Sequence, residues 1–178
     1  MPTDPLMLAY LAGVIDSDGY ITINRSTRNG VVYFGAVIGV SGTRRQPHDL
    51  AASLWGGKVG YHQPKNPRHR GQFLWSRQGK AAATAILEVM PYLRIKVDQA
   101  WLALELNEHV LSGQGDDPFP WFSPDYDPRP YREDLVTSMR SLNQSRKAAG
   151  RELDGRTWDE YPNSLPPVSV ALSTEEPK

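Results

Sequence analysis

The sequence predicts an α+β fold in which helices surround two consecutive β-hairpins. Two segments within the first 111 residues read as strands, and each is followed by a turn or loop and a returning strand. Helical segments precede, separate and follow these hairpins, so the predicted order is α-β-β-α-β-β-α-α. Four strands in two hairpins make an antiparallel sheet, and we expect helices on one face and a polar, basic opposite face.

The first element is a helix that begins at Pro5, because Asp4 can cap it and proline suits the first helical position. The helical pattern runs to about Asp16 or Ser17, and Gly19 is a typical stop. Its apolar residues surround the helix, which predicts that it is covered on more than one side. They are Leu6, Met7, Leu8, Leu11, Ala12, Val14 and Ile15.

The first hairpin follows directly. Residues 20–28 alternate, with Ile21 and Ile23 on one face. Asn29-Gly30 is a strong hairpin-turn signal, and residues 31–41 form the returning strand. A short helix then begins at Pro47 and ends at Gly56-Gly57.

The second hairpin comprises strands 58–63 and 72–77, joined by a basic loop rich in proline and glycine. Two helices follow, at residues 80–90 and 96–111. The proline-rich stretch 112–130 lacks periodicity and reads as an arm, residues 131–161 as a mainly helical segment, and residues 162–178 as a disordered tail.

Composition restricts the class of protein. The 178 residues suit one domain with a tail, and the absence of cysteine excludes disulfides and thiolate metal sites. We expect an intracellular, reducing compartment. No basic leader precedes the first apolar run, and no apolar run is long enough to span a membrane, so we expect neither a signal peptide nor a membrane partner.

The zero net charge hides an uneven distribution. Residues 20–80 contain ten Lys or Arg and one acid, a net charge of +9, whereas residues 112–178 contain eight basic and twelve acidic residues, a net charge of −4. A basic block within the predicted sheet region favours a nucleic-acid partner. The four histidines have no metal-binding spacing, and we interpret them as ordinary polar residues.

The stretch LAGVIDSDG at residues 11–19 resembles the LAGLIDADG motif of homing endonucleases, with seven of nine residues identical. The resemblance implies an αββαββα core with a saddle-shaped antiparallel four-stranded sheet over residues 1–111. A single motif implies the single-motif subclass, which acts as a homodimer on double-stranded DNA. The motif helices of two copies would then pack side by side, and we expect this interface to contain Leu8, Leu11, Ala12, Gly13 and Ile15. The alternative is a helix buried entirely within one chain.

The two aspartates of the motif lie at the negative end of a helix, where carboxylates are disfavoured unless a cation compensates them. Hard divalent cations prefer oxygen ligands. The resemblance assigns Asp18, with the Ser17 carbonyl, to Mg²⁺ or another divalent cation and leaves Asp16 as a structural cap. The alternative is an ordinary Asp-Gly turn.

The resemblance also implies three further catalytic candidates. Lys96, within PYLRIKVDQA, matches a conserved basic residue beside the active site. Arg45 and Gln46 follow the second strand, where the family often has polar or basic residues. The strand-end glutamine of many relatives is replaced by Ser41 or Gly42.

DNA would lie on the outward face of the sheet, because a two-stranded ribbon fits the major groove. Asn and Gln can pair with adenine and Arg with guanine, and other basic residues would meet phosphates. Each residue has the alternative of being a solvated surface side chain. The candidates are Tyr20, Thr22, Asn24, Ser26, Arg28, Tyr33, Gln63, Lys65, Arg68, Arg70, Gln72 and Arg77, together with Arg146 and Lys147 of SLNQSRK, which resembles a backbone-contacting helix end.

The predicted function is therefore a site-specific endonuclease that cuts both strands of a long, pseudo-palindromic DNA duplex by metal-dependent hydrolysis. The first alternative is an inactive nucleic-acid-binding protein of the same fold, either an intron maturase or a DNA-binding regulator. The second is a small α+β domain that binds no nucleic acid.

Overall fold

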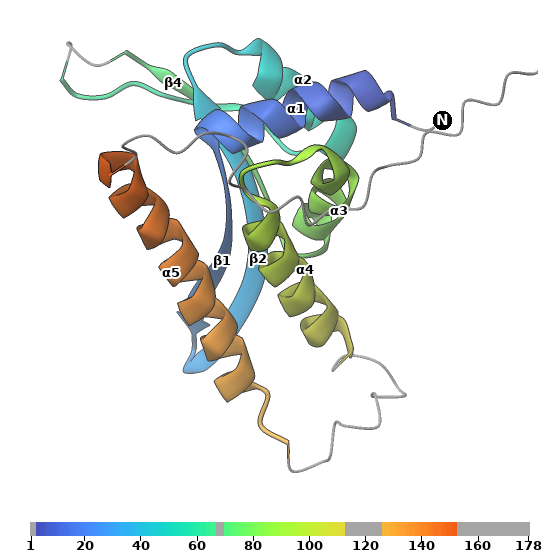
Figure 1. Ribbon diagram of the computed structural model, residues 1–178, viewed down its shortest axis with the longest axis vertical. Coiled ribbons are helices and arrows are strands. Elements are labelled where there is room, and N and C mark those ends of the chain that lie inside the picture. The colour runs from blue at the N-terminus through green and yellow to red at the C-terminus, as the bar shows by residue number, and fades with distance from the viewer. Residues whose placement is uncertain (1–2, 67–69, 113–125, 153–178) are drawn as a thin grey trace, which may run out of the picture.

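The computed structural model describes residues 3–66, 70–112 and 126–152, without the side chains of residues 145–152 (Figure 1). Its elements follow the predicted order. They are α1 (Pro5–Asp18), β1 (Gly19–Arg28), β2 (Val31–Gly42), α2 (Gln46–Trp55), β3 (Gly60–His62), β4 (Gln72–Gln78), α3 (Lys80–Val89), the 3₁₀ turn η1 (Met90–Tyr92), α4 (Val97–Ser112) and α5 (Arg129–Glu152).

The four strands form one antiparallel sheet in the order β1-β2-β4-β3, which confirms the α+β prediction. Asn29 and Gly30 join β1 to β2 with positive φ angles of 52° and 79°, the backbone that a type I′ hairpin turn requires. In the resulting register Ile21 faces Ile38, and both side chains are buried. The Asn-Gly signal therefore identified the turn and the face of β1 that points into the core.

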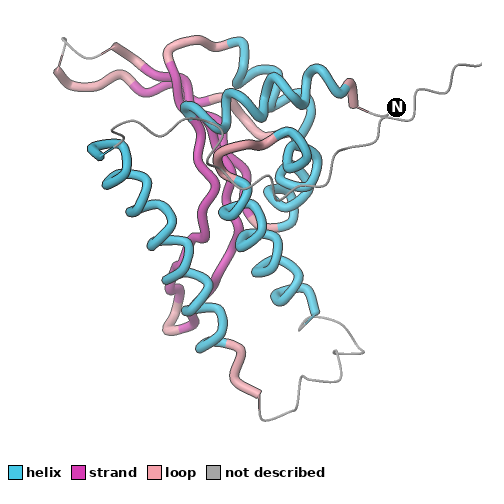
Figure 2. Tube along the Cα trace, in the orientation of Figure 1, coloured by secondary structure: helices cyan, strands magenta, loops and turns pink. Residues whose placement is uncertain are grey.

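The helices gather on one side of the strands (Figure 2). The first helix, α1, contacts β1 and β2, α4 packs on the same two strands, and α5 runs alongside β1 (Figure 1). Large side chains from every layer meet without solvent access, among them Leu11, Ile38, Trp75, Ile86 and Leu106. The opposite face of the sheet carries no helix among the described residues, so it is open to a partner.

The passage from α1 into β1 depends on Gly19. Asp4 caps the start of α1, where its Oδ1 accepts from the Leu6 amide at 2.9 Å, and the helix continues to Asp18, slightly beyond the predicted end. A Cβ at position 19 would lie 2.7 Å from the Ile15 Cα and 2.8 Å from the Gly39 carbonyl oxygen. Only glycine lets the chain turn directly from helix to strand at this point.

Two predicted boundaries were wrong. The strand predicted at residues 58–63 is limited to β3, Gly60–His62. The arm predicted at residues 112–130 overlaps two helices, since Ser112 ends α4, and Arg129 and Pro130 begin α5. Proline is tolerated in the first turn of a helix, so Pro130 did not mark a break. Residues 113–125 of the arm and all of the predicted tail lie outside the described residues.

The C-terminal helix α5 completes the helical layer. Leu135, Val136 and Met139 are buried, and Arg25 Nε of β1 lies 2.7 Å from Glu133 Oε1. Arg25 therefore belongs to the helix-covered face of the sheet. Among the described residues, no helix combines the length and the apolar character that crossing a bilayer requires.

Candidate functional site

The C-terminal tip of α1 carries the two motif aspartates, and the structure gives them different environments. Asp16 Oδ2 accepts from the amides of Arg94 (2.7 Å) and Ile95 (3.1 Å), and its Oδ1 accepts from the Lys96 amide (2.9 Å). These three hydrogen bonds hold the turn before α4 against α1. Asp16 is thus a structural cap, as predicted from its position.

Asp18 is exposed, and within the described residues no hydrogen bond or ion pair holds its carboxylate. The neighbouring Ser17 is also exposed, and its hydroxyl donates to the Val14 carbonyl at 3.2 Å. The Gly19 amide donates to the carbonyls of Ile15 and Val14, which closes the helix end. Asp18 therefore projects from a fixed helix tip with its oxygens available for a ligand.

Lys96 brings a positive charge to the same tip. Its Nζ donates to the Ile15 carbonyl at 2.8 Å and to the Asp16 carbonyl by a shorter bond. The ammonium thus sits at the negative end of the α1 dipole, where a cation is stabilising. The structure therefore brings Lys96 to the helix end that carries Ser17 and Asp18, although Lys96 is far from them in the sequence.

Arg45 and Gln46 begin α2 at the same end of the sheet. Gly19 faces Val40 in the β1–β2 register, so the end of β2 reaches the level of the α1 tip. Arg45 Nε lies 3.1 Å from Asp49 Oδ2, in an exposed pair, and Gln46 is exposed. Ser41 follows Val40 in β2 and pairs with Leu74 of β4, so it lies at the same end of the sheet.

His48 was interpreted as an ordinary polar residue, but it is 1% exposed. Its Nδ1 lies 2.9 Å from the Arg44 carbonyl oxygen, and its ring packs near Phe73 with centroids 6.2 Å apart. It therefore fixes the turn that leads from β2 to Arg45. Sequence alone gave no signal for this burial, because the neighbours of His48 come from distant strands.

The outward face of β1 carries five of the residues that were predicted to contact DNA. Ile21 and Ile23 point into the core, so the alternate residues point to the open side. These are Tyr20, Thr22, Asn24, Ser26 and Arg28. Tyr33 of β2 is 52% exposed, near the end of the same hairpin.

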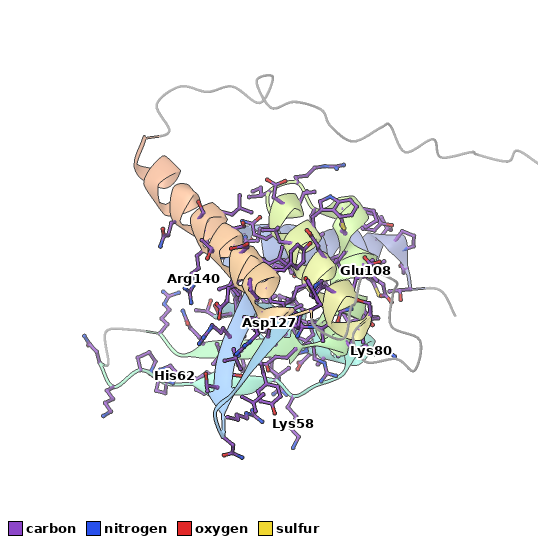
Figure 3. All side chains as sticks on the ribbon, turned by 90° about the horizontal axis from the view of Figure 1, so that it is seen from below. Lys58, His62, Lys80, Glu108, Asp127 and Arg140 are labelled. Carbon is purple, nitrogen blue, oxygen red and sulfur yellow. The ribbon has the colours of Figure 1, made fainter. Side chains whose placement is uncertain are left out.

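The second hairpin extends this surface. Gln72 is exposed and pairs with His62, and Lys65 and Arg70 are exposed in the connecting loop. Lys58 and His62 lie on the strand side of the molecule, whereas Arg140 and Glu108 lie on the helix side (Figure 3). Arg68 lies outside the described residues, as do the side chains of Arg146 and Lys147.

Two residues of this hairpin that were predicted to contact DNA, Arg77 and Gln63, do not lie on the open face. Arg77 faces Ile38 and shares the inner face with Trp75, because alternate residues of a strand point the same way. A Cβ at Gly57 would lie 3.1 Å from its Cδ, and its Nε is buried without a partner among the described residues. Gln63 shares the face of Tyr61, whose hydroxyl donates to Gln63 Oε1 at 2.8 Å.

The predicted dimer interface is wrong for four of its five residues. Leu8, Leu11, Ala12 and Ile15 are buried in the core of the single chain, with exposures of 8, 0, 0 and 0%. The apolar belt around α1 did not indicate which side the sheet and the other helices would cover. Gly13 alone is exposed, and a Cβ there would have no atom within 4 Å.

The exposed side of α1 has its own apolar residues. Leu6 is 78% exposed and Tyr10 is 51% exposed. Together with Gly13 and Ser17 they recur at intervals of four, three and four residues, which places them on one face of the helix. This set is named the α1 stripe below.

The junction of α4 and α5 holds a polar cluster that the sequence did not reveal. The His109 ring stacks on Tyr131 at 4.6 Å, and Arg132 Nε donates to His109 Nδ1 at 3.2 Å. Burial and the charge of Arg132 lower the pKa of His109. The Tyr131 hydroxyl donates to the Glu105 carboxylate, and this bond with burial raises the pKa of Tyr131 to about 12.

A divalent cation fits the α1 tip only in part. Within the described residues no three His, Asp or Glu side chains are grouped to hold a metal ion. One chain offers a single unpartnered carboxylate, Asp18, beside the closed helix end. Oxygen is the right donor for a hard cation, but one carboxylate is fewer ligands than such a cation takes, so the tip of one chain does not form a full site.

No protein-family model matches the sequence, and no curated protein matches it. Solved structures are similar. The homing endonuclease I-CvuI in complex with its target has a TM-score of 0.57 at 20% identity, over 78% of this chain and 82% of that chain. The homing endonuclease I-TnaI has a TM-score of 0.52 at 12% identity, over 83% and 99%. The archaeal intron-encoded I-Vdi141I, complexed with DNA, has a TM-score of 0.50 at 10% identity, over 78% and 98%.

These similarities identify the fold of the chain. The chain has the fold of the homing endonucleases, and the LAGVIDSDG motif occupies the helix tip at the end of its sheet. This agreement confirms the LAGLIDADG fold predicted from the motif.

Proposed function

We propose that this protein is a homodimeric, divalent-metal-dependent endonuclease that cuts double-stranded DNA at a specific, pseudo-palindromic site. The observation that carries the proposal is the contrast at the α1 tip. Asp16 is used by three backbone donors, whereas Asp18 is exposed and unpartnered among the described residues. A carboxylate kept unpaired at a negative helix end favours a bound cation.

The α1 stripe supports a second copy as the partner. Leu6 and Tyr10 expose large apolar side chains, and Gly13 leaves space for another backbone to approach closely. Two copies joined along α1 would bring both tips near one two-fold axis. Each would contribute one Asp18 carboxylate to the incomplete site described above.

The open face of the sheet supports DNA as the substrate. It carries exposed Asn24, Arg28 and Gln72 over two hairpins, and exposed Lys65 and Arg70 at its rim. I-CvuI and I-Vdi141I, which share the fold, were solved with DNA. Amide and guanidinium groups can read base edges, and the lysines can meet phosphates.

The protein's own groups would have separate tasks. Asp18 would hold the cation, which activates water and stabilises the leaving oxygen when bound. Asp16 fixes the tip by binding the turn at residues 94–96. Lys96 places its ammonium at the negative end of the α1 dipole, beside the carbonyls that end the helix. Arg45 and Gln46, at the same end of the sheet, would contact the DNA near the cut.

The test is a cleavage selection on a randomised duplex library, with and without Mg²⁺. We expect a cut, enriched, two-fold-symmetric site with Mg²⁺ only, and no product from Asp18→Asn. Glu108→Gln is the matched control, because it removes one exposed carboxylate on the helix side of the molecule (Figure 3). Equal cutting by wild type and Asp18→Asn would show that Asp18 is not the metal ligand.

The same experiment tests the inactive alternative. Selection of a bound sequence without cleavage, at every divalent ion tried, would identify a DNA-binding protein that does not cut. Binding to the enriched site should weaken steeply with salt, because phosphate contacts release counterions.

A further inference from the structure

A row of three residues crosses the open face of the sheet beside the α1 tip. Tyr20 of β1 faces Gly39 of β2, which faces Ser76 of β4. Tyr20 is the one large side chain of this row, and only Gly19 separates it from Asp18. The row therefore borders the proposed cutting site on the side where DNA would lie.

The Tyr20 ring lies over Gly39 instead of projecting away from the sheet. A Cβ built on Gly39 would meet the ring Cζ at 2.5 Å and the hydroxyl Oη at 2.5 Å. No cross-strand neighbour with a side chain could occupy position 39 while the ring keeps this place. Tyr20 remains 41% exposed, so the surface of the ring is available to a ligand.

The residues around the Tyr20 ring carry no charge that could neutralise a phosphate. Neither Gly39 nor Ser76 carries a charge, and the outward face of β2 continues as Val37 and Gly35. A ring held against a strand offers a flat, rigid surface. In a duplex the bases are stacked on one another, so such a surface would pack against the sugar of a nucleotide and position it without reading the base.

We propose that Tyr20 is a fixed aromatic platform for the nucleotide beside the cut, and that Gly39 is a positioning residue that acts through it. The inference rests on the proposed function and adds a side chain that would set the distance between the bound DNA and the Asp18 carboxylate. A displaced ring would shift the scissile phosphate relative to the Asp18 carboxylate. Small shifts in such geometry cost a large part of the catalytic rate.

The test compares Gly39→Ala with Gly35→Ala. Both add one methyl group to the outward face of β2, but a Cβ at Gly35 has no atom within 4 Å. At Gly39 the methyl group meets only the far end of the flexible Tyr20 side chain among its three nearest atoms, so the ring can move while the strand stays folded. We expect Gly39→Ala to lower the single-turnover cleavage rate roughly ten- to hundredfold with little change in DNA affinity. Gly35→Ala should match wild type in both.

Three further variants show whether Gly39 acts through the ring. Tyr20→Phe keeps the ring and should cut like wild type, whereas Tyr20→Ala should be as slow as Gly39→Ala. Adding Gly39→Ala to Tyr20→Ala should cause no further loss, because the ring is already gone. In NMR spectra of the free protein, the Gly39 Hα signals should lose their ring-current shift in Tyr20→Ala.

The outcomes separate this inference from the proposed function. If wild type cuts DNA and Gly39→Ala cuts equally well, the platform is wrong and the endonuclease stands. If Gly39→Ala slows cleavage equally in the Tyr20→Ala background, Gly39 does not act through the ring, and the inference is also wrong. A wild-type chain that cuts no duplex contradicts both.

Discussion

The α1 helix and the α4–α5 junction show two uses of polar groups in one small protein. At the junction three pairs of polar or charged groups are formed within the chain: Arg132 bonds His109, Tyr131 bonds Glu105, and Arg25 of β1 bonds Glu133 of α5. At α1, Asp18 has no partner among the described residues, and Leu6 and Tyr10 face solvent. The junction pairs these groups within one chain, whereas α1 leaves a carboxylate and two large apolar side chains exposed, as the proposed cation and second copy require.

This difference also distinguishes two carboxylates that are close in the sequence. Asp16 and Asp18 lie two residues apart on one helix end. Their hydrogen bonds, not their residue type, distinguish them. Substitutions at four positions test this contrast.

The largest effect should come from Asp18→Asn. Cleavage of the selected duplex should fall roughly thousandfold, since a preorganised charge at the reacting phosphate is lost. The urea midpoint should stay at the wild-type value or rise slightly, because no hydrogen bond depends on Asp18 within the described chain and the substitution removes a negative charge from the negative end of the helix. A large loss of stability in Asp18→Asn would show that the Asp18 carboxylate has a structural role, and it would contradict the contrast with Asp16.

The second effect concerns the α1 stripe. Tyr10→Arg should weaken the dimer by about 2 kcal/mol or more, the usual effect of losing an aromatic anchor, with a shift toward monomer in sedimentation velocity. Leu87→Arg is the control, because Leu87 is 60% exposed on α3, outside the stripe. Equal sedimentation of both variants and wild type would remove the stripe as the interface.

The third effect is the converse at Asp16. Asp16→Asn leaves one of its acceptor oxygens and removes the charge, so we expect a loss of about 1–2 kcal/mol in the free energy of unfolding. Urea denaturation of Asp16→Asn beside Asp18→Asn measures both halves of the comparison. Identical midpoints for the two variants would contradict the structural role of Asp16.

The smallest effect is a pH dependence at the junction. The pKa of His109 is lowered in the folded chain, so below the unfolded value of about 6.5 the unfolded chain binds the proton first. Stability should therefore fall as the pH drops from 6.5 toward the lowered pKa, and protonation also removes the acceptor of the Arg132 bond. His109→Phe keeps the ring against Tyr131, and its urea midpoint should fall less than that of wild type between pH 7 and 5. An equal fall in both proteins would assign the dependence to other groups.

Much of the fold could be predicted from the sequence because its signals are local. The Asn29-Gly30 turn, the alternation around Ile21 and the breaker residues between helices each act within a few residues. The inward position of Arg77 was available to the same reasoning, since Trp75 precedes it by two residues. The number of basic residues in 20–80 did not show that Arg77 points inward, because such a number does not say on which face of the sheet each charge lies.

The motif by itself predicted the fold, the helix end at its aspartates and separate roles for Asp16 and Asp18. Tertiary structure alone decided which side of α1 is exposed, that His48 is buried and that Lys96 bonds the end of α1. The reason is physical. Turn preferences and strand alternation arise between neighbours in the chain, whereas burial and hydrogen-bond partners depend on side chains that packing brings together from distant segments.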